Sequence, residues 1–482
     1  MIKTVTQKRF YSGIAESIKE GLTGACNFTR NINIVDEPSQ ITLMPKTVLD
    51  SGETVTGLVK WCVSGAPYNT NTYFLDENGH FYKRTAGGTW SDLRTVANCH
   101  GQGLAVWDDY AYYTGDTFIG FYGPLSGVPA FTDAWWAGLE DTSDTKFAPC
   151  IPFKEGIAFL TGGVVNWTTL AGSTASRLVL PKGFEGRTLE VLDEYLVIGA
   201  WRGTSILDTE DGYLFFWDGD ATTYNFFVKI NEGGANAILN TKNKLLSVVG
   251  SAGVLNLNYA PFNHVHTIPK LEGGKYLDVF PGAVSNWKGK ALIGVSGVHN
   301  SATVRQGVYT WANKSDRYPE GLSMPFTISS GAFDSDVKIG MVKGLGDELF
   351  ISWQDGQSYG VDVVTDTNAP FMEGIYEGLI FDDADPTKGM LALRLKASHL
   401  PLAAGESIQL GYKTDRSASY TTGTANSTVG EMETLLPITA SVARCRDFQY
   451  EVILGNNGKV STSPTVTGIS LQYDDLADEE EF

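Results

Sequence analysis

Short apolar segments recur along most of the chain, and each follows a short polar turn. Six such units follow one another, each made of a turn and an apolar strand that ends in a small or aromatic residue. The units are Trp107–Gly115, Phe153–Leu160, Leu192–Gly199, Thr241–Val248, Trp287–Gly294 and Leu345–Trp353. Further β-like runs follow several of them, for example Tyr213–Trp217 and Gly307–Trp311. Strands and tight turns in close succession predict an antiparallel meander.

The spacing of these units matches the repeat of a β-propeller. Measured between the turns at Asp108, Lys154, Asp193, Lys242, Lys288 and Gly346, the steps are 46, 39, 49, 46 and 58 residues. A four-stranded blade takes roughly 40–50 residues. A seventh unit precedes them, because Asn78-Gly79 between two aromatic runs is a strong hairpin signal. Seven units between about Thr54 and Phe371 predict six or seven blades, an arrangement that leaves only short sheet edges.

The pattern changes on both sides of this repeat. Residues 1–50 predict an N-terminal arm with a short helix at Ile14–Glu20, and we hypothesise that a strand at Gln40–Met44 joins the last blade and closes the ring. Beyond Glu373, alternation of period 2 predicts an antiparallel β-sandwich. Its strands are Met390–Lys396, Ser407–Tyr412, Phe448–Leu454 and Thr465–Tyr473.

The predicted fold class is therefore all-β: a six- or seven-bladed β-propeller with an N-terminal arm and a C-terminal antiparallel β-sandwich. The expected domains are the arm at 1–50, the propeller at 51–372, the sandwich at 373–473 and an acidic, disordered tail at 474–482.

Composition and charge narrow the possible functions. The 482 residues are 42% hydrophobic and 12% aromatic with 54 glycines, as expected for many strands and turns. The formal net charge is −19, and no run of lysine or arginine exceeds two residues. Tight binding of nucleic acid is therefore excluded, because it needs basic side chains that neutralise phosphates. Five scattered cysteines indicate reduced, mostly buried thiols, and the polar N-terminus predicts neither a secretory signal nor membrane insertion.

The chain carries no intact catalytic signature. It has no Gly-x-Ser-x-Gly elbow, Walker A loop, dinucleotide-binding Gly-x-Gly-x-x-Gly or His-Glu-x-x-His. We therefore predict no enzymatic activity, no cofactor and no metal. The absence of these motifs does not exclude a glycosidase, because the two carboxylates of a glycosidase need not be close in the sequence.

Several weaker candidates have structural explanations that we favour. His264 and His266 are half of a possible metal site, but the sequence nearby offers no third ligand. Asp208–Gly212 resembles the start of a calcium loop without its closing glutamate, so a hairpin turn is the simpler interpretation. Gly87–Ser91 resembles the end of an Asp-box, although position 85 is threonine where that turn motif needs aspartate.

Nine tryptophans of the propeller region are further candidates, because exposed tryptophans can contact glycans or proteins. Because Trp107, Trp287 and Trp353 stand beside the repeated turn, packing between blades is the favoured interpretation. The nine are Trp90, Trp107, Trp135, Trp136, Trp201, Trp217, Trp287, Trp311 and Trp353.

Four segments carry a family resemblance: Phe10–Gly21 and Phe28–Ile34 near the start, and Leu400–Ile408 and Ser463–Ile469 near the end. They resemble structural proteins of tailed-bacteriophage tails. The resemblance implies a virion component: a tail-tip or baseplate protein, or the nozzle of a short tail. No catalytic residue of the family carries over.

The leading hypothesis is a structural tail protein that acts through protein–protein interfaces in a homo-oligomeric ring. Its partners would be other tail proteins, and DNA would pass through the ring without specific binding. It would be located in the virion tail after assembly in the host cytoplasm. Two alternatives stay open: a propeller that binds or hydrolyses host glycans, and a cytosolic protein-interaction propeller.

Overall fold

The computed structural model describes most of the chain. The described residues are 2–17, 22–52, 54–142, 147–169, 172–173, 178–205, 208–231, 233–241, 244–250, 255–259, 263–268, 276–298, 305–332, 337–382, 389–438, 444–457 and 461–475. By their mutual contacts they form two compact units. One unit is Val48–Val308 with Ile328–Val363, and the other is Met1–Thr47, Tyr309–Thr327 and Val364–Phe482.

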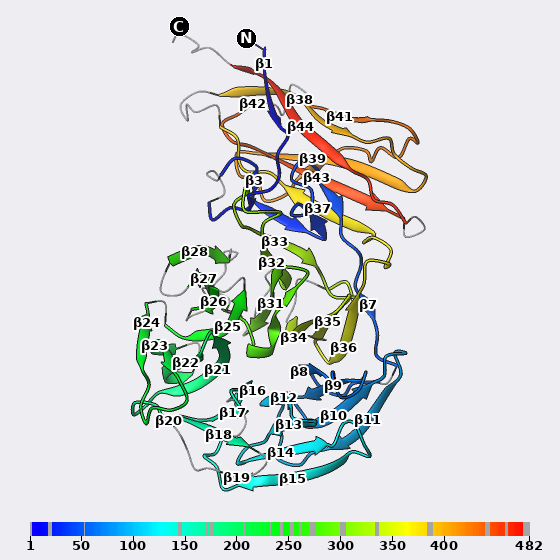
Figure 1. The fold of residues 1–482 in the computed structure, drawn as a ribbon. Helices are drawn as coiled ribbons and strands as arrows, with labels where there is room; N and C mark the ends of the chain where they lie inside the picture. The colour runs from blue at the N-terminus through cyan, green and yellow to red at the C-terminus, as the bar shows by residue number, and fades with distance from the viewer. Residues whose placement is uncertain are drawn as a thin grey trace. The chain divides into compact units, whose positions relative to one another are not determined.

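Seven sheets of four or five strands follow one another in the described residues (Figure 1). The first sheet is β8 (Val59–Ser64), β9 (Thr72–Asp76), β10 (His80–Arg84) and β11 (Trp90–Thr95). The second is β12 (Gly103–Trp107), β13 (Tyr110–Thr114), β14 (Phe118–Gly123) and β15 (Ala130–Ala137). The third is β16 (Cys150–Phe153), β17 (Gly156–Thr161), β18 (Val164–Thr169) and β19 (Gly172–Ser173), with β20 (Leu178–Val179) also paired to β18.

The remaining sheets continue the same order. The fourth is β21 (Glu185–Leu192), β22 (Tyr195–Ser205), β23 (Asp208–Trp217) and β24 (Phe226–Ile230). The fifth is β25 (Ala235–Thr241), β26 (Lys244–Val249), β27 (Leu255–Tyr259) and β28 (Asn263–Ile268). The sixth is β29 (Tyr276–Asp278), β31 (Lys290–Val298), β32 (Gly307–Ala312) and β33 (Gly321–Phe326), with the 3-10 helix η1 (Pro281–Ala283) and β30 (Val284–Trp287) after β29. The seventh is β34 (Lys338–Leu345), β35 (Glu348–Asp355), β36 (Ser358–Val364) and β7 (Val48–Leu49).

The inner strands of these sheets close into a ring. Neighbours in the sequence β8, β12, β16, β21, β25, β30 and β34 contact one another, and β34 contacts β8 again. Seven sheets arranged in a closed cycle are a seven-bladed β-propeller, within the predicted range of six or seven.

The repeated polar turn of the sequence joins two antiparallel strands in five of the blades, whereas the predicted turn at Lys242 lies outside the described residues. In the second blade it is Asp108-Asp109, with φ of 43° and 71°, between β12 and β13. In the sixth it is Lys288-Gly289, with φ of 49° and 75°, between β30 and β31. Positive φ at both central residues is the type I′ geometry that matches the twist of a hairpin, and Asp and Gly adopt it at low cost.

The ring is closed by the N-terminal segment, but not by the residues that we expected. Val48 and Leu49 of β7 pair with Val363 and Asp362 of β36. The expected closing strand, Gln40–Met44, contributes instead β6 (Thr42–Leu43), which pairs with β5 (Ile32–Asn33). A two-residue pairing is fixed by its partner strand, so the local pattern alone could not locate it.

The second unit contains the sandwich. One sheet has the order β1 (Ile2–Gln7), β44 (Val466–Asp475), β38 (Met390–His399) and β41 (Glu433–Pro437), with β42 (Arg444–Cys445) beside β38. The other has the order β4 (Phe28–Arg30), β37 (Glu373–Glu377), β43 (Phe448–Asn456), β39 (Glu406–Thr414) and β40 (Thr421–Thr422). A short parallel pair, β2 (Gly13–Ile14) and β3 (Ala25–Cys26), also belongs to this unit.

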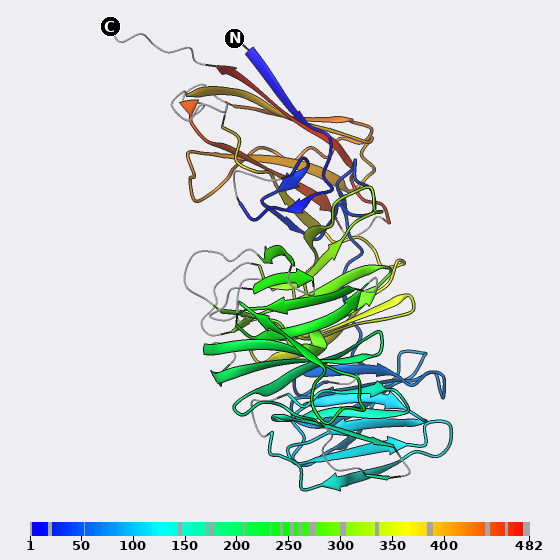
Figure 2. The ribbon, with the colours of Figure 1, turned by 60° about the vertical axis from the view of Figure 1, so that its left-hand side comes forward.

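Most of the N-terminal arm is therefore part of the sandwich. Figure 2 shows its blue strands beside the orange and red strands of the C-terminal region. The expected helix at Ile14–Glu20 is wrong in its described part, because Ile14 belongs to β2 and residues 15–17 are not helical. Likewise, Asp474 and Asp475 end β44 and not a disordered tail, and residues 476–482 lie outside the described residues.

Candidate functional site

The candidate motifs of the sequence lie in ordinary strands and turns of the propeller. His264 is exposed on β28 whereas His266 is buried, because a register shift separates their pairings with β27. Asp211 of the calcium-loop candidate lies within β23, not in a turn, and its pKa is lowered chiefly by Lys229, 2.9 Å away. Among the described residues, no group of three or more His, Cys, Asp or Glu side chains is arranged to hold a metal.

The Asp-box candidate is a plain hairpin turn. Thr85 accepts a hydrogen bond from the Thr89 amide at 3.2 Å, where the motif would use aspartate. Gly88 has φ of 80° in this turn, and Trp90 begins β11 directly after it.

The nine candidate tryptophans are all at least partly buried. Trp287 connects the sixth and seventh blades, with Nε1 donating to the Gly346 carbonyl at 3.2 Å. Trp107 packs against a cluster shared by the second and third blades. Trp353 instead donates to Asp362 of the neighbouring strand in its own sheet, at 2.8 Å. Trp287 and Trp107 therefore pack between neighbouring blades.

A cavity of about 430 Å³ lies at the propeller axis and is lined by the inner strands of all seven blades. Helix η1 contacts inner strands β8, β21, β25 and β34, which belong to the first, fourth, fifth and seventh blades. A segment that contacts strands on opposite sides of a ring must cross its axis. Pro281 and Gly282 of η1 also line the cavity, so the helix obstructs the axis.

Glu190 is the single carboxylate among the residues that line this cavity. Its oxygens accept hydrogen bonds from the backbone amides of Val191 and Asn240, at 2.9 and 3.3 Å. Burial raises its pKa, while those bonds and Lys343 act in the opposite direction. Because Asn240 belongs to the next blade, Glu190 links two blades.

A second buried network reaches across three blades. Arg187 donates to the Asn236 carbonyl at 3.1 Å and to both carboxylate oxygens of Asp278 at 2.9 Å. Its guanidinium also lies 4.8 Å from the centre of the Phe147 ring. Arg187 and Asp278 are each about 5% exposed, so their charges are mutually neutralised and not available to a ligand.

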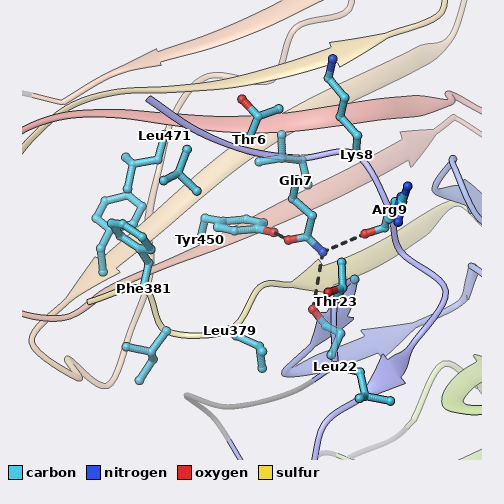
Figure 3. A pocket seen from close by; sticks show the side chains of 16 residues that line it. Thr6, Gln7, Lys8, Arg9, Leu22, Thr23, Leu379, Phe381, Tyr450 and Leu471 are labelled. Atoms are coloured by element: carbon cyan, nitrogen blue, oxygen red, sulfur yellow. Dashed lines mark hydrogen bonds between the residues drawn. The ribbon is translucent and has the colours of Figure 1, made fainter. Parts of the chain in front are cut away.

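The sandwich unit contains an open, mostly apolar cleft of about 480 Å³ (Figure 3). Its walls come from β1, β44 and β43, and from the segments around Leu22 and Phe381. Leu22 is 64% exposed and Val5 is 41% exposed, so apolar groups at the cleft remain accessible to solvent. The full lining is Val5–Arg9, Leu22–Ala25, Leu379–Phe381, Phe448, Tyr450, Ile469 and Leu471.

The polar groups inside this cleft are already paired. Gln7 donates to the Tyr376 hydroxyl at 2.8 Å and to the Arg9 carbonyl at 3.2 Å, and it accepts a hydrogen bond from Tyr450. Burial raises the pKa values of both tyrosines well above their usual range, so they stay protonated. These hydrogen bonds fix β1 against the sandwich. The interior of the cleft can therefore bind a partner mainly through apolar contacts.

Other exposed apolar side chains lie mainly on edge strands and loop tips. Phe226 and Phe227 on β24, the last strand of the fourth blade, are 44% and 49% exposed. Leu435 on edge strand β41 is 48% exposed. Apolar groups at sheet edges favour contact with other proteins. No described helix is long and apolar enough to span a bilayer.

Comparisons with known proteins give likenesses of fold. No protein-family model matches the chain, and neither does any curated protein. The WD40 domain of Pan2 from Neurospora crassa superposes with a TM-score of 0.41 and 10% identity, over 64% of this chain and 89% of that domain. The extracellular domain of a hybrid two component system from B. thetaiotaomicron gives a TM-score of 0.46 and 10% identity, over 87% of this chain and 59% of that one.

Proposed function

We propose that the chain is a structural component of a bacteriophage tail, at the tip, baseplate or nozzle, and that it acts through protein–protein interfaces in a ring of identical copies. The observation that carries the proposal is the location of the accessible apolar surface. It lies in the sandwich cleft and on strand edges, whereas the propeller axis is obstructed by η1. Apolar surface at edges suits a subunit that is covered by neighbours.

DNA, in this proposal, passes through the ring of copies and not through the axis of one propeller. The axial cavity of about 430 Å³ is far too small for a duplex, and η1 crosses it. The net charge of −19 favours weak contact between a DNA backbone and the wall of such a ring.

The glycan-hydrolysing alternative requires two carboxylates within about 5–10 Å of each other in one pocket. The described lining of the axial cavity supplies Glu190 alone, held by two backbone amides. The accessible side chains therefore favour assembly over glycoside hydrolysis.

Particles of the phage that encodes the chain provide the test. Quantitative mass spectrometry should find the chain in a fixed small-integer ratio to other tail proteins, and cryo-EM should place it in a ring. A chain that is absent from particles and stays monomeric would overturn the proposal. Glycan-array binding or release of reducing sugar by the purified chain would support the alternative instead.

A further inference from the structure

The sandwich cleft combines an apolar interior with a basic mouth. Its interior presents Val5, Leu379, Phe381, Ile469 and Leu471. The residues that line it include the exposed side chains of Lys8 and Arg9 but no aspartate or glutamate. In a chain of net charge −19, such a surface selects a partner with an apolar group and several carboxylates.

The C-terminal segment of the chain has this chemistry. Residues 476–482 read Leu-Ala-Asp-Glu-Glu-Glu-Phe, so four carboxylates stand directly before Phe482. We propose that the cleft binds the C-terminal segment of a second copy, with Phe482 in the apolar interior and the acidic residues at the mouth. The inference rests on the proposed assembly role and names the contact that links one copy to the next.

The geometry of the cleft separates its apolar interior from the basic residues at its mouth. In Figure 3, Gln7 points into the cleft whereas the ammonium of Lys8 points away from its floor. Carboxylates that approach the mouth can therefore remain hydrated beside Lys8 and Arg9 while the aromatic ring is buried. Burial of a phenylalanine side chain contributes enough to change affinity by roughly 10- to 100-fold.

Chain length favours a second copy over the same copy. The cleft-lining residues of β44 are Ile469 and Leu471, which lie four to six strand positions, or about 14–20 Å, before Asp475. Seven residues span at most about 25 Å when extended, and a reversal of direction uses at least two of them. The five residues that remain span about 17 Å, so the segment reaches its own cleft only when almost fully extended, whereas a neighbour's segment is free of this restriction. A contact between two different surfaces can repeat around a ring.

A labelled peptide with the sequence of residues 474–482 tests the site directly. A chain that lacks residues 476–482 should bind this peptide saturably, and replacement of Phe482 by alanine in the peptide should weaken binding at least tenfold. Lys8→Glu with Arg9→Glu in the protein should weaken it about tenfold or more. Lys182→Glu with Lys244→Glu, an equal change of charge at exposed propeller residues, should leave it unchanged.

Sedimentation of the full chain tests the source of the segment. Self-association should increase with protein concentration and should be lost when residues 476–482 are removed. Failure of the peptide to bind, or binding that is indifferent to both Phe482 and the basic pair, would overturn the site. A full chain that stays monomeric and excludes the peptide would overturn the second copy in favour of the same chain. Detection in virions is a separate measurement, so the assembly role can stand if this contact fails.

Discussion

Glu451 is a buried carboxyl of the sandwich whose surroundings raise its pKa. In the antiparallel register of β43 and β37 it stands directly opposite Glu377. Burial and the negative charges of Glu377 and Glu373 raise its pKa from 4.5 to about 7, although Lys413 and Arg30 act in the opposite direction. The folded state therefore holds a proton that the unfolded chain releases above about pH 4.5.

The sign of the pH dependence follows from this difference. Stability from the retained proton is complete below about pH 4.5 and is lost as the pH rises through about 7. Glu451→Gln should raise the free energy of unfolding at pH 8 by about 1–2 kcal/mol, less than the full shift implies because solvent screens part of the repulsion. Denaturant titrations between pH 4 and 8 would measure it. A difference between variant and parent that is the same at every pH would contradict this, and exposed Glu155→Gln serves as control.

Arg84 illustrates a buried charge that stabilises ring closure. It belongs to β10 of the first blade and is 5% exposed. Nε donates to Asp50, beside the closing strand, at 2.5 Å, and Nη2 donates to Glu348 of the seventh blade at 3.1 Å. Its guanidinium also lies 4.9 Å from the centre of the Phe350 ring. One side chain thus connects the first blade to two segments of the seventh.

Removal of one partner from this network leaves the other charge buried. Arg84→Met and Asp50→Asn should each destabilise the propeller by about 2–4 kcal/mol, and the double variant by clearly less than the sum. A double-mutant cycle by thermal or chemical unfolding gives the coupling. Exposed Arg94→Met, which breaks the ion pair with Asp133, should cost less than about 1 kcal/mol. Additive effects of the two buried substitutions would show that the pair is not coupled.

At the scale of elements, the sequence predicts those turns and strands whose conformation depends on neighbouring residues. The repeated turns were found because Asp108-Asp109 and Lys288-Gly289 stand between apolar runs, and both adopt the positive φ that such a hairpin needs. Elements that depend on distant partners were missed. The sequence predicts only an arm at Ile2–Gln7, yet this segment is an edge strand of the sandwich because β44 offers it a partner. The cleft could not be predicted, since its walls come from separate parts of the chain.

The closing strand β7 offers a direct test of ring closure. Val48 and Val363 are opposite each other in an antiparallel pair, where Cα atoms lie about 4.5–5.5 Å apart, within the range of a disulfide. The double variant Val48→Cys with Val363→Cys should raise the unfolding temperature on oxidation and lose the gain with reductant, because the bond closes a very long loop. All five native cysteines are buried and unbonded, so they should not compete. No bond under oxidising conditions would argue against this pairing.

At the scale of the whole molecule, the chain is interleaved. Residues 1–47 leave the sandwich unit before the propeller begins at Val48, and Val364–Phe482 return to it after the propeller ends. Residues 309–327, which include most of β32 and all of β33, also group with the sandwich unit. A prediction that divides the chain into consecutive domains misses this, because local patterning carries no information about which distant segments pair.

Interleaving predicts that the C-terminal region cannot fold by itself. Residues 373–482 lack strands β1 and β4, which pair with β44 and β37, and they lack Phe10, whose ring packs edge-on against Tyr376 at 5.5 Å. A fragment of about 110 residues with two unpaired sheet edges and an uncovered core loses much of the apolar burial that stabilises a domain of this size. Circular dichroism and thermal melts should show no cooperative transition for 373–482. Joining residues 1–47 to residues 364–482 through a flexible linker should restore one, because the missing strands return to their partners. If the fragment melts cooperatively without them, the N-terminal strands are accessory to a complete sandwich.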